Sequence, residues 1–346
     1  LTDKGEESHK KAKAELQKRL DALNDKLNGY LSSTYGINKE TEKKKYQKWF
    51  ESHQPFHWFA EFYEIINGNG GFDVVIGNPP YVEYSAVRNS YVLHNYSTIK
   101  SGNLYVYVVE RSIQIQNNNS YNGMIIPLSA YCTDRMEAFQ KFEYANCKSI
   151  YLSNYAERPS KLFEGAERNL TIALFRKDNK VNNNTNIYTT YYYKWNSQFR
   201  GILFDNISYS LTNGTNTKSI IPKISCSVEA SLMRILRNVN KALGVYVTRN
   251  SNYVLFYRNS GGRYWKIITN FQPQFYLNSK KGISSRESYL YFADNNSLKT
   301  AVAILNSSLY YWFYIMNSDA RTNNPSDLKD FPIILENISL RLPLSA

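Results

Sequence analysis

Cysteine is scarce in this sequence of 346 residues. The three cysteines, Cys132, Cys147 and Cys226, are an odd number, and no two of them form a CxxC pair or have a pair of histidines nearby. A disulfide framework needs an even set of cysteines, and a structural zinc site needs clustered Cys or His ligands. Neither is therefore indicated, no metal is expected, and a reducing cytoplasm is the expected location.

Long apolar runs are also missing. The most apolar stretch near the C-terminus, residues 301–316, is interrupted by Asn306, Ser307 and Ser308. It falls short of the roughly 18 apolar residues that a membrane-spanning helix needs, so no membrane span is expected. The sequence begins at Leu1 instead of Met and shows no basic-then-apolar signal region. We therefore expect it to start inside a longer polypeptide.

Acidic residues are outnumbered, with 29 Asp and Glu against 42 Lys and Arg, which gives a formal net charge of +13. This excess favours a polyanionic partner such as nucleic acid or an anionic membrane surface, although a generally basic soluble protein has the same composition. The 30 tyrosines suit base stacking as well as ordinary β-sheet packing. Composition alone does not choose between these alternatives.

The first 54 residues are expected to form a helical segment. One helix face over residues 6–31 is predicted by alternating spacings of four and three between Leu16, Leu20, Leu23, Leu27 and Tyr30. The basic run at residues 43–48 is predicted to lie on the solvated face of a second short helix, with nucleic-acid contact as an alternative.

From residue 55 to about 180 the pattern predicts an α/β domain. The aromatic residues at 55–66 are expected to be core, with a binding platform as the alternative. Residues 72–77 form a continuous apolar run typical of a strand buried on both faces of a parallel sheet. Helices are predicted at 104–115 and 138–145, and further strands at 123–127, 149–154 and 170–175. This alternation of strands and helices is typical of α/β folds.

Beyond residue 180 the sequence changes to Asn-rich turns and short aromatic strands, such as 188–193 and 245–257. A domain boundary is therefore expected near 177–184, followed by a mixed α+β domain at 181–346. A helix is predicted at 296–314 and a closing loop at 325–332.

The tetrapeptide Asn78-Pro79-Pro80-Tyr81 directly follows the predicted strand, where open α/β sheets place their ligands. Two prolines fix φ and donate no N–H, so the loop is stiff and its carbonyls stay available. The Asn78 side-chain oxygen and the Pro79 carbonyl can each accept an N–H from an exocyclic amine such as adenine N6. These bonds make the lone pair of the amine available for in-line methyl transfer.

Tyr81 offers a flat face for the base, and such stacking contributes roughly 1–3 kcal/mol. Because the amine of a paired adenine lies inside the duplex, the base must be flipped out to reach this loop. The alternative is an ordinary turn after a strand, since Asn-Pro and Pro-Pro are common turn dipeptides.

Residues 56–59 and the run 71–82, GFDVVIGNPPYV, resemble the fourth motif region of adenine-N6 DNA methyltransferases, in particular those of type IIG restriction-modification enzymes. The resemblance continues through residues 103–105, 123–127, 162–165 and 170–175. It implies a partial Rossmann-like methyltransferase domain that uses S-adenosylmethionine and acts on double-stranded DNA. It also implies that Tyr81 and Phe163 sandwich a flipped adenine, with an ordinary core position as the alternative for Phe163.

The C-terminal half resembles the target-recognition domains of these enzymes through residues 303–311 and 326–332. Each candidate DNA contact, judged singly, can equally be a solvated surface charge. The candidates are Arg249, Arg258, Arg263, Lys280, Lys281, Arg286 and Arg321.

The sequence departs from the resembled family at the methyl donor. Those enzymes carry a Gly-rich strand-to-helix turn for S-adenosylmethionine and an acidic residue for its ribose upstream of the tetrapeptide, and neither occurs here. Residues 68–71 are glycine-rich but precede the wrong strand and open no helix. In the resembled sheet a donor-binding strand pairs with residues 72–77, whose edge is therefore expected to be unpaired. We expect a missing N-terminal half, either a separate polypeptide or lost by truncation, and no methylation by this chain alone; in the resembled enzymes a nuclease domain is often fused at the N-terminus.

Two other functions remain open. One is a non-catalytic DNA-binding specificity subunit or remnant, which also predicts salt-dependent DNA binding. The other is methylation of a protein glutamine amide or an RNA adenine, because the same tetrapeptide occurs in such enzymes. The long aromatic C-terminal domain favours DNA over these substrates.

Overall fold

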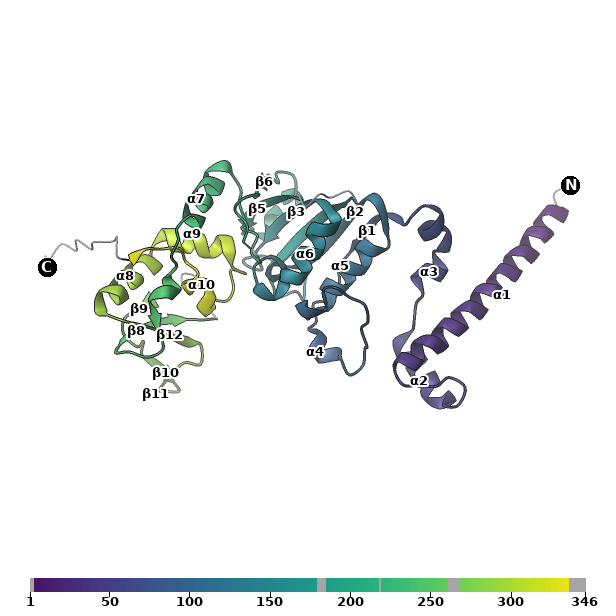
Figure 1. Cartoon of the computed structure of the whole chain (residues 1–346), viewed down its shortest axis with the longest axis horizontal. Helices are drawn as coiled ribbons and strands as arrows, with labels where there is room; N and C mark the ends of the chain where they lie inside the picture. The colour runs from purple at the N-terminus through teal and green to yellow at the C-terminus, as the bar shows by residue number, and fades with distance from the viewer. Residues whose placement is uncertain (1–2, 179–184, 218, 261–267, 336–346) are drawn as a thin grey trace.

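The structure, a computed structural model, describes residues 3–178, 185–217, 219–260 and 268–335. Helix α1 (Asp3–Thr34) reaches away from the rest of the molecule, and α2 (Lys43–His53) lies beside its C-terminal end (Figure 1). Both predicted helices are confirmed. The apolar stripe of α1 is largely uncovered by the described residues, with Leu16 67% and Tyr30 74% exposed.

The body is an α/β unit built on a six-stranded mixed sheet in the order β1-β2-β4-β3-β5-β6. Its strands are β1 (Phe72–Gly77), β2 (Gln116–Pro127), β3 (Cys147–Tyr155), β4 (Leu170–Lys177), β5 (Asn186–Tyr193) and β6 (Ser210–Leu211). Strand β1 is parallel to β2, and β3 is parallel to β5, whereas β4 runs antiparallel to both of its neighbours. The carboxyl ends of β1, β2 and β3 therefore lie at one end of the sheet, beside the start of β4.

Helices α5 (Leu104–Gln114) and α6 (Glu137–Asn146) pack on the sheet over a core that includes Val106, Ile126, Phe139 and Ile150 (Figure 1). A buried lysine, Lys177, links α5 to the sheet by hydrogen bonds. Lys177 Nζ donates to the carbonyls of Ile113, at the C-terminal end of α5, and Gln116, at 2.7 and 2.6 Å. Carbonyls at a helix end have no partner within the helix, so this side chain fastens α5 to the sheet.

The expectation that residues 72–77 are buried on both faces is wrong. The strand forms, but Val74 is 58% and Ile76 79% exposed. Among the described residues β1 pairs only with β2, so it is an edge strand. Val75 packs against the core that α5 and α6 cover, whereas no described neighbour covers most of the Val74 and Ile76 side chains.

The aromatic residues at 55–66 were expected in the core, and this is also wrong. Phe56, Trp58, Phe59 and Tyr63 are 53%, 41%, 56% and 64% exposed. They lie in and around α3 (Trp58–Glu61) and the π-helical turn η1 (Glu64–Gly68), which lead into β1. Some of these rings contact each other, as Phe56 and Trp58 do edge to face with centroids 5.0 Å apart.

The sheet continues past the boundary expected near 177–184. Strands β5 and β6 belong to it, and Tyr151 on β3 stacks on Tyr188 on β5 with centroids 4.7 Å apart. Ile187 and Tyr192 on β5 are buried. The change of composition near residue 180 therefore falls between two strands, β4 and β5, of the same sheet.

The C-terminal unit combines helices with a small antiparallel sheet in the order β7-β12-β8-β9, around buried Leu255, Phe292, Ala301 and Phe331. Its strands are β7 (Val247–Thr248), β8 (Tyr253–Arg258), β9 (Ile268–Thr269) and β12 (Glu287–Phe292), with a separate hairpin of β10 (Phe275–Leu277) and β11 (Lys280–Gly282). Its helices are α7 (Ser227–Arg237), α8 (Asn295–Leu305), α9 (Ser308–Asn317) and α10 (Pro325–Lys329).

Two expectations for this unit need correction. The helix predicted at 296–314 is two helices, because the Ser307 side chain caps α9 by accepting from Tyr310 N, and the Asn306 side chain donates to the Ile268 carbonyl. The closing loop predicted at 325–332 contains α10. At the start of this helix Asn324 N donates a hydrogen bond to the Asp327 carboxylate, as in a capping box.

Short helical turns connect the remaining segments: α4 (Tyr84–Val87), η2 (Ile99–Ser101), η3 (Leu128–Tyr131), η4 (Asp134–Met136), η5 (Ser197–Ile202) and η6 (Leu243–Tyr246). Among the described residues no helix is both long and apolar enough to cross a membrane.

Candidate active site at the carboxyl end of β1

The Asn-Pro-Pro-Tyr loop leaves β1 at its carboxyl end, with Asn78 and Pro80 exposed and Pro79 buried. The Tyr81 hydroxyl lies 2.7 Å from Asn78 Oδ1 and 2.8 Å from the carbonyl of Ile125 on β2. A phenol has one proton, so these two acceptors share it. Tyr81 thus ties the loop to the neighbouring strand and holds the Asn78 amide oxygen in place.

Half-burial of the Tyr81 ring raises the pKa of its hydroxyl to about 12. The hydroxyl therefore stays protonated, and remains a donor, across the neutral range. An amide oxygen has two lone pairs, so Asn78 Oδ1 can accept a further N–H while it is held by Tyr81. The structure leaves this oxygen oriented and still able to bind a donor.

Residues just after the tetrapeptide fasten it to the start of α5. The Val82 carbonyl accepts from Leu104 N at 2.9 Å, and Asn103 Nδ2 donates to Glu83 Oε1 at 2.9 Å. Arg135 donates to both Glu83 oxygens, at 2.9 and 2.7 Å. These bonds from Arg135 hold the pKa of Glu83 below its usual value.

Sequence reasoning did not single out Glu83 or Arg135. They lie 52 residues apart, on the loop after β1 and on the turn before α6, and no local pattern marks a pair at that separation. Asn103 entered only through the family resemblance, and Leu104 also as the first residue of the helix predicted at 104–115.

Phe163 lies in the connection between β3 and β4, at the same end of the sheet as Asn78. Phe163 and Tyr81 both pack, partly buried, against one cluster made by Tyr155, Leu162, Leu170 and Trp195. The structure therefore brings these two predicted rings to a common apolar surface. Whether a base lies between them stays a prediction.

The candidate DNA contacts fall into two groups. Those exposed on the C-terminal unit are Arg249, Arg258, Lys280, Lys281 and Arg286. Arg321 instead donates to the Glu167 carbonyl at 2.5 Å, on the connection that carries Phe163. Arg263 lies outside the described residues.

Comparison with known sequences identifies the class of protein that this chain resembles. Residues 3–163 match a family described as the Eco57I restriction-modification methylase. This match ends at Phe163, so it contains the tetrapeptide, α5, α6 and β1 to β3. In sequence, the N-terminal part of the chain is thus similar to a restriction-modification methylase.

A particular relative is RM.MjaORFECS2P of Methanocaldococcus jannaschii, named as a type II restriction enzyme and methyltransferase. It is 30% identical over 249 residues, which are 66% of this chain and 20% of that protein. The chain therefore spans about a fifth of the length of this relative.

Two solved structures show weak likeness. A DrdV–DNA complex gives a TM-score of 0.34 at 14% identity, over 42% of this chain and 18% of that one. A nuclease-deletion mutant of the Type ISP restriction-modification enzyme LlaGI, with a DNA substrate mimic, gives 0.35 at 14% identity, over 54% and 17%. At these scores the likeness carries no argument.

Proposed function

We propose that this chain is the catalytic-loop and DNA-recognising part of a site-specific adenine-N6 DNA methyltransferase, the modification component of a restriction-modification system. One observation carries the proposal. An Asn-Pro-Pro-Tyr loop stands at the carboxyl end of β1, with Asn78 exposed and its amide oxygen held by the Tyr81 hydroxyl at 2.7 Å. The match of residues 3–163 to a methylase family supports it.

In this proposal the loop prepares the adenine amine for attack. The free lone pair of Asn78 Oδ1 and the Pro79 carbonyl each accept one N6 hydrogen, which draws the nitrogen toward tetrahedral geometry and exposes its lone pair. No strong base is needed, because the neutral amine attacks the methyl group, and the methylated nitrogen, which then carries a positive charge, is acidic and loses its extra proton to water. Tyr81 and Phe163 stack on the flipped base, whose removal from the duplex this mechanism requires.

S-adenosylmethionine is the proposed methyl donor, but residues 68–71 do not form its site. Gly71 has a φ of +127°, and a Cβ on it would lie 2.5 Å from the Ile115 carbonyl oxygen. Position 71 is glycine because the backbone here passes close to the segment that enters β2. The element that follows is strand β1, whereas a donor-binding turn opens a helix. We derive no step through the donor from these residues.

The exposed edge of β1 is where we place a donor-binding half of the enzyme. An edge strand has unpaired backbone N–H and C=O groups, and Val74 and Ile76 present apolar side chains there, 58% and 79% exposed. A strand added beside β1 extends the sheet next to Asn78. The domain that carries this strand would also bury the exposed aromatic residues around α3.

DNA recognition is assigned to the C-terminal unit and within it to the β10–β11 hairpin, in which every residue of β11 is exposed. Lys280 and Lys281 lie on β11 beside Tyr276 and Leu277, which are 58% and 64% exposed. Lysines bind phosphates, and a two-stranded ribbon fits the width of a DNA groove. Arg286 follows the hairpin and is also exposed.

The test uses the complete reading frame that contains this chain, expressed in a bacterium without adenine methyltransferases. Genomic DNA is digested to nucleosides and analysed for N6-methyladenine by mass spectrometry. We expect the modified base with the unaltered protein and with Asn296→Ala, an exposed asparagine on α8, and its loss with Asn78→Ala. Purified Asn78→Ala protein should still bind duplex DNA.

Wild-type levels of N6-methyladenine in the Asn78→Ala strain would exclude the role given to this residue. A different modified base would exclude adenine as the target. DNA binding by the complete protein without any methylation would favour a specificity subunit instead.

A further inference from the structure

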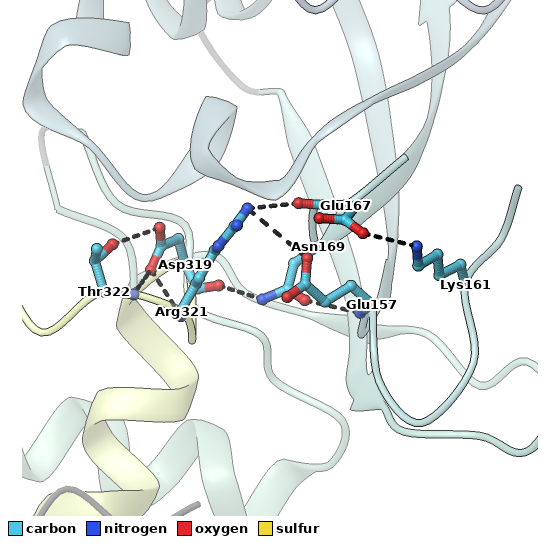
Figure 2. Close-up of polar contacts among 7 residues, drawn as sticks. All are labelled: Glu157, Lys161, Glu167, Asn169, Asp319, Arg321 and Thr322. Carbon is cyan, nitrogen blue, oxygen red and sulfur yellow. Dashed lines mark hydrogen bonds and ion pairs between the residues drawn. The ribbon is translucent and has the colours of Figure 1, made fainter. Parts of the chain in front are cut away.

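The connection between β3 and β4, residues 156–169, carries Phe163 and is closed by one side chain. Asn169 Oδ1 accepts from Glu157 N at 2.9 Å, which joins the two ends of this 156–169 loop. The Asn169 Nδ2 donates to the carbonyl of Asp319 at 2.6 Å, in the turn after α9 of the C-terminal unit (Figure 2). One amide therefore joins both ends of the loop to the other unit.

The turn that receives this bond, residues 319–322, is itself well held. Asp319 Oδ1 accepts from Arg321 N and Thr322 N, both at 2.9 Å, and its Oδ2 accepts from the Thr322 hydroxyl at 2.7 Å (Figure 2). Just before the turn, buried Lys223 Nζ donates to the Ser318 carbonyl at 2.7 Å. The 319–322 turn can therefore transmit a displacement instead of absorbing it.

Arg321 makes a second connection from the turn to the loop. Its Nη1 donates to the Glu167 carbonyl at 2.5 Å and lies 3.7 Å from Glu157 Oε2 (Figure 2). That separation is longer than a hydrogen bond, and among the described residues the buried Glu157 Oε2 has no hydrogen-bond partner. The guanidinium thus faces acceptors near both ends of the loop.

The middle of the loop is held from the opposite side. Arg200, on η5, donates to the carbonyls of Lys161 and Leu162 at 2.6 and 3.1 Å. Phe163 follows directly, so its position depends on Arg200 from the α/β unit and on the two ends fixed to the 319–322 turn.

We propose that Asn169 and Arg321 are positioning residues through which the C-terminal unit sets the conformation of the Phe163 loop. The inference rests on the proposed function, because only there does Phe163 contact a base. It also means that Arg321 connects the two units and does not contact DNA. When the C-terminal unit engages its target, movement of the 319–322 turn is passed to both ends of the loop. Recognition of the site and stacking of the base are thereby linked.

The first test needs no DNA. Amide hydrogen exchange is measured by mass spectrometry on the full chain, with Asn169→Ala, Arg321→Gln and, as a control for lost charge, Arg249→Gln. Loss of one such bond raises exchange about tenfold in a locally opening segment. We expect that increase at residues 158–168 in both test variants, with α5 and β2 unchanged, and no increase in the control. Unchanged exchange in both test variants would overturn the proposal.

The second test asks whether the connection serves the reaction. Duplex DNA should alter exchange at 158–168 in the unaltered protein but only at the C-terminal unit in Arg321→Gln. In the complete enzyme, Arg321→Gln should lower kcat and leave the KM for DNA unchanged, while Arg321→Lys restores part of kcat. A raised KM with unchanged kcat would make Arg321 a DNA contact and refute the proposal. If the unaltered protein binds no DNA, the proposed function fails, while the DNA-free measurement still decides the connection.

Discussion

Replacing Tyr81 by Phe tests the central feature of the candidate site, because it removes one hydroxyl and leaves the ring. In the structure this hydroxyl reaches Asn78 Oδ1 at 2.7 Å and the Ile125 carbonyl at 2.8 Å. The ring keeps its edge contact with Tyr105, whose centroid is 6.4 Å away. The variant therefore separates the orientation of Asn78 from the stacking surface.

The expected magnitudes follow from one lost donor. A hydrogen bond inside a protein contributes a net 0.5–1.5 kcal/mol or so, and we therefore expect the free energy of unfolding to fall by about 1 kcal/mol. For methyl transfer, an Asn78 amide that is no longer held raises the barrier by a similar amount, or about five- to tenfold in rate. The KM for DNA should stay unchanged, because the stacking ring remains.

Urea denaturation gives the stability, and single-turnover methylation by the complete enzyme gives the rate. Tyr84→Phe is the matched control, because its hydroxyl donates to the Tyr91 carbonyl at 3.1 Å, away from Asn78. The control should lose comparable stability and keep its rate. If Tyr81→Phe loses stability but methylates at the wild-type rate, its hydroxyl does not orient Asn78. If both variants lose rate equally, the effect is general destabilisation.

Three further predictions concern the fold. Gly71→Ala should lower the free energy of unfolding, measured in urea, by about 3 kcal/mol or more, because φ at this residue is +127° and an added Cβ meets backbone atoms at 2.5 Å. Gly165→Ala is the control and should lower it by about 1 kcal/mol, because φ is +81° there but the space around a Cβ is open. Equal losses in the two variants would contradict this explanation. Burial raises the pKa of Asp327 to about 7 from 3.8, so the folded state binds this proton more tightly, and stability should fall by up to about 4 kcal/mol as pH rises from 4 to 7. Denaturation across that range should be flatter for Asp327→Asn, and an equally steep curve would exclude this group. We expect this chain to self-associate through the exposed edge of β1, and Ile76→Lys should reduce that association in sedimentation measurements with little loss of stability, because Ile76 is 79% exposed at a strand edge. Unchanged association would show that the edge is not the contact.

Local signals in the sequence predicted most elements but not their surroundings. The apolar run 72–77 and the proline loop after it define a strand followed by a turn, and the structure confirms both. Burial of that strand depends on neighbours that no local pattern encodes, so Val74 and Ile76 were misjudged. The Asn-rich stretch near residue 182 looks like a linker, yet β5 beyond it pairs with β3 across a long separation.

The sequence named the residues of the candidate site but not the hydrogen bonds among them. The position of Asn78 follows from the strand before it. Tyr81 was assigned only to stacking, although a spacing of three residues in a loop allows its hydroxyl to reach Asn78, as it does. Arg321 resembled an ordinary surface cation, because its acceptors on the 156–169 loop lie about 150 residues earlier in the chain. Such contacts arise from tertiary structure and leave no mark in the adjacent sequence.

The proposed reaction needs a part of the site that binds the base and a part that binds the methyl donor, and only the first is held by bonds within this chain. On the side of the base, the Tyr81 hydroxyl, Asn78 and the loop that carries Phe163 are all held by bonds within this chain. On the other side, β1 presents an edge with exposed apolar residues. Because the base side is already ordered, a donor-binding half added along β1 need not rebuild it. Methylation should therefore be recoverable when the two halves are supplied as separate polypeptides, and it should depend on Ile76 at the edge as well as on Asn78 in the loop.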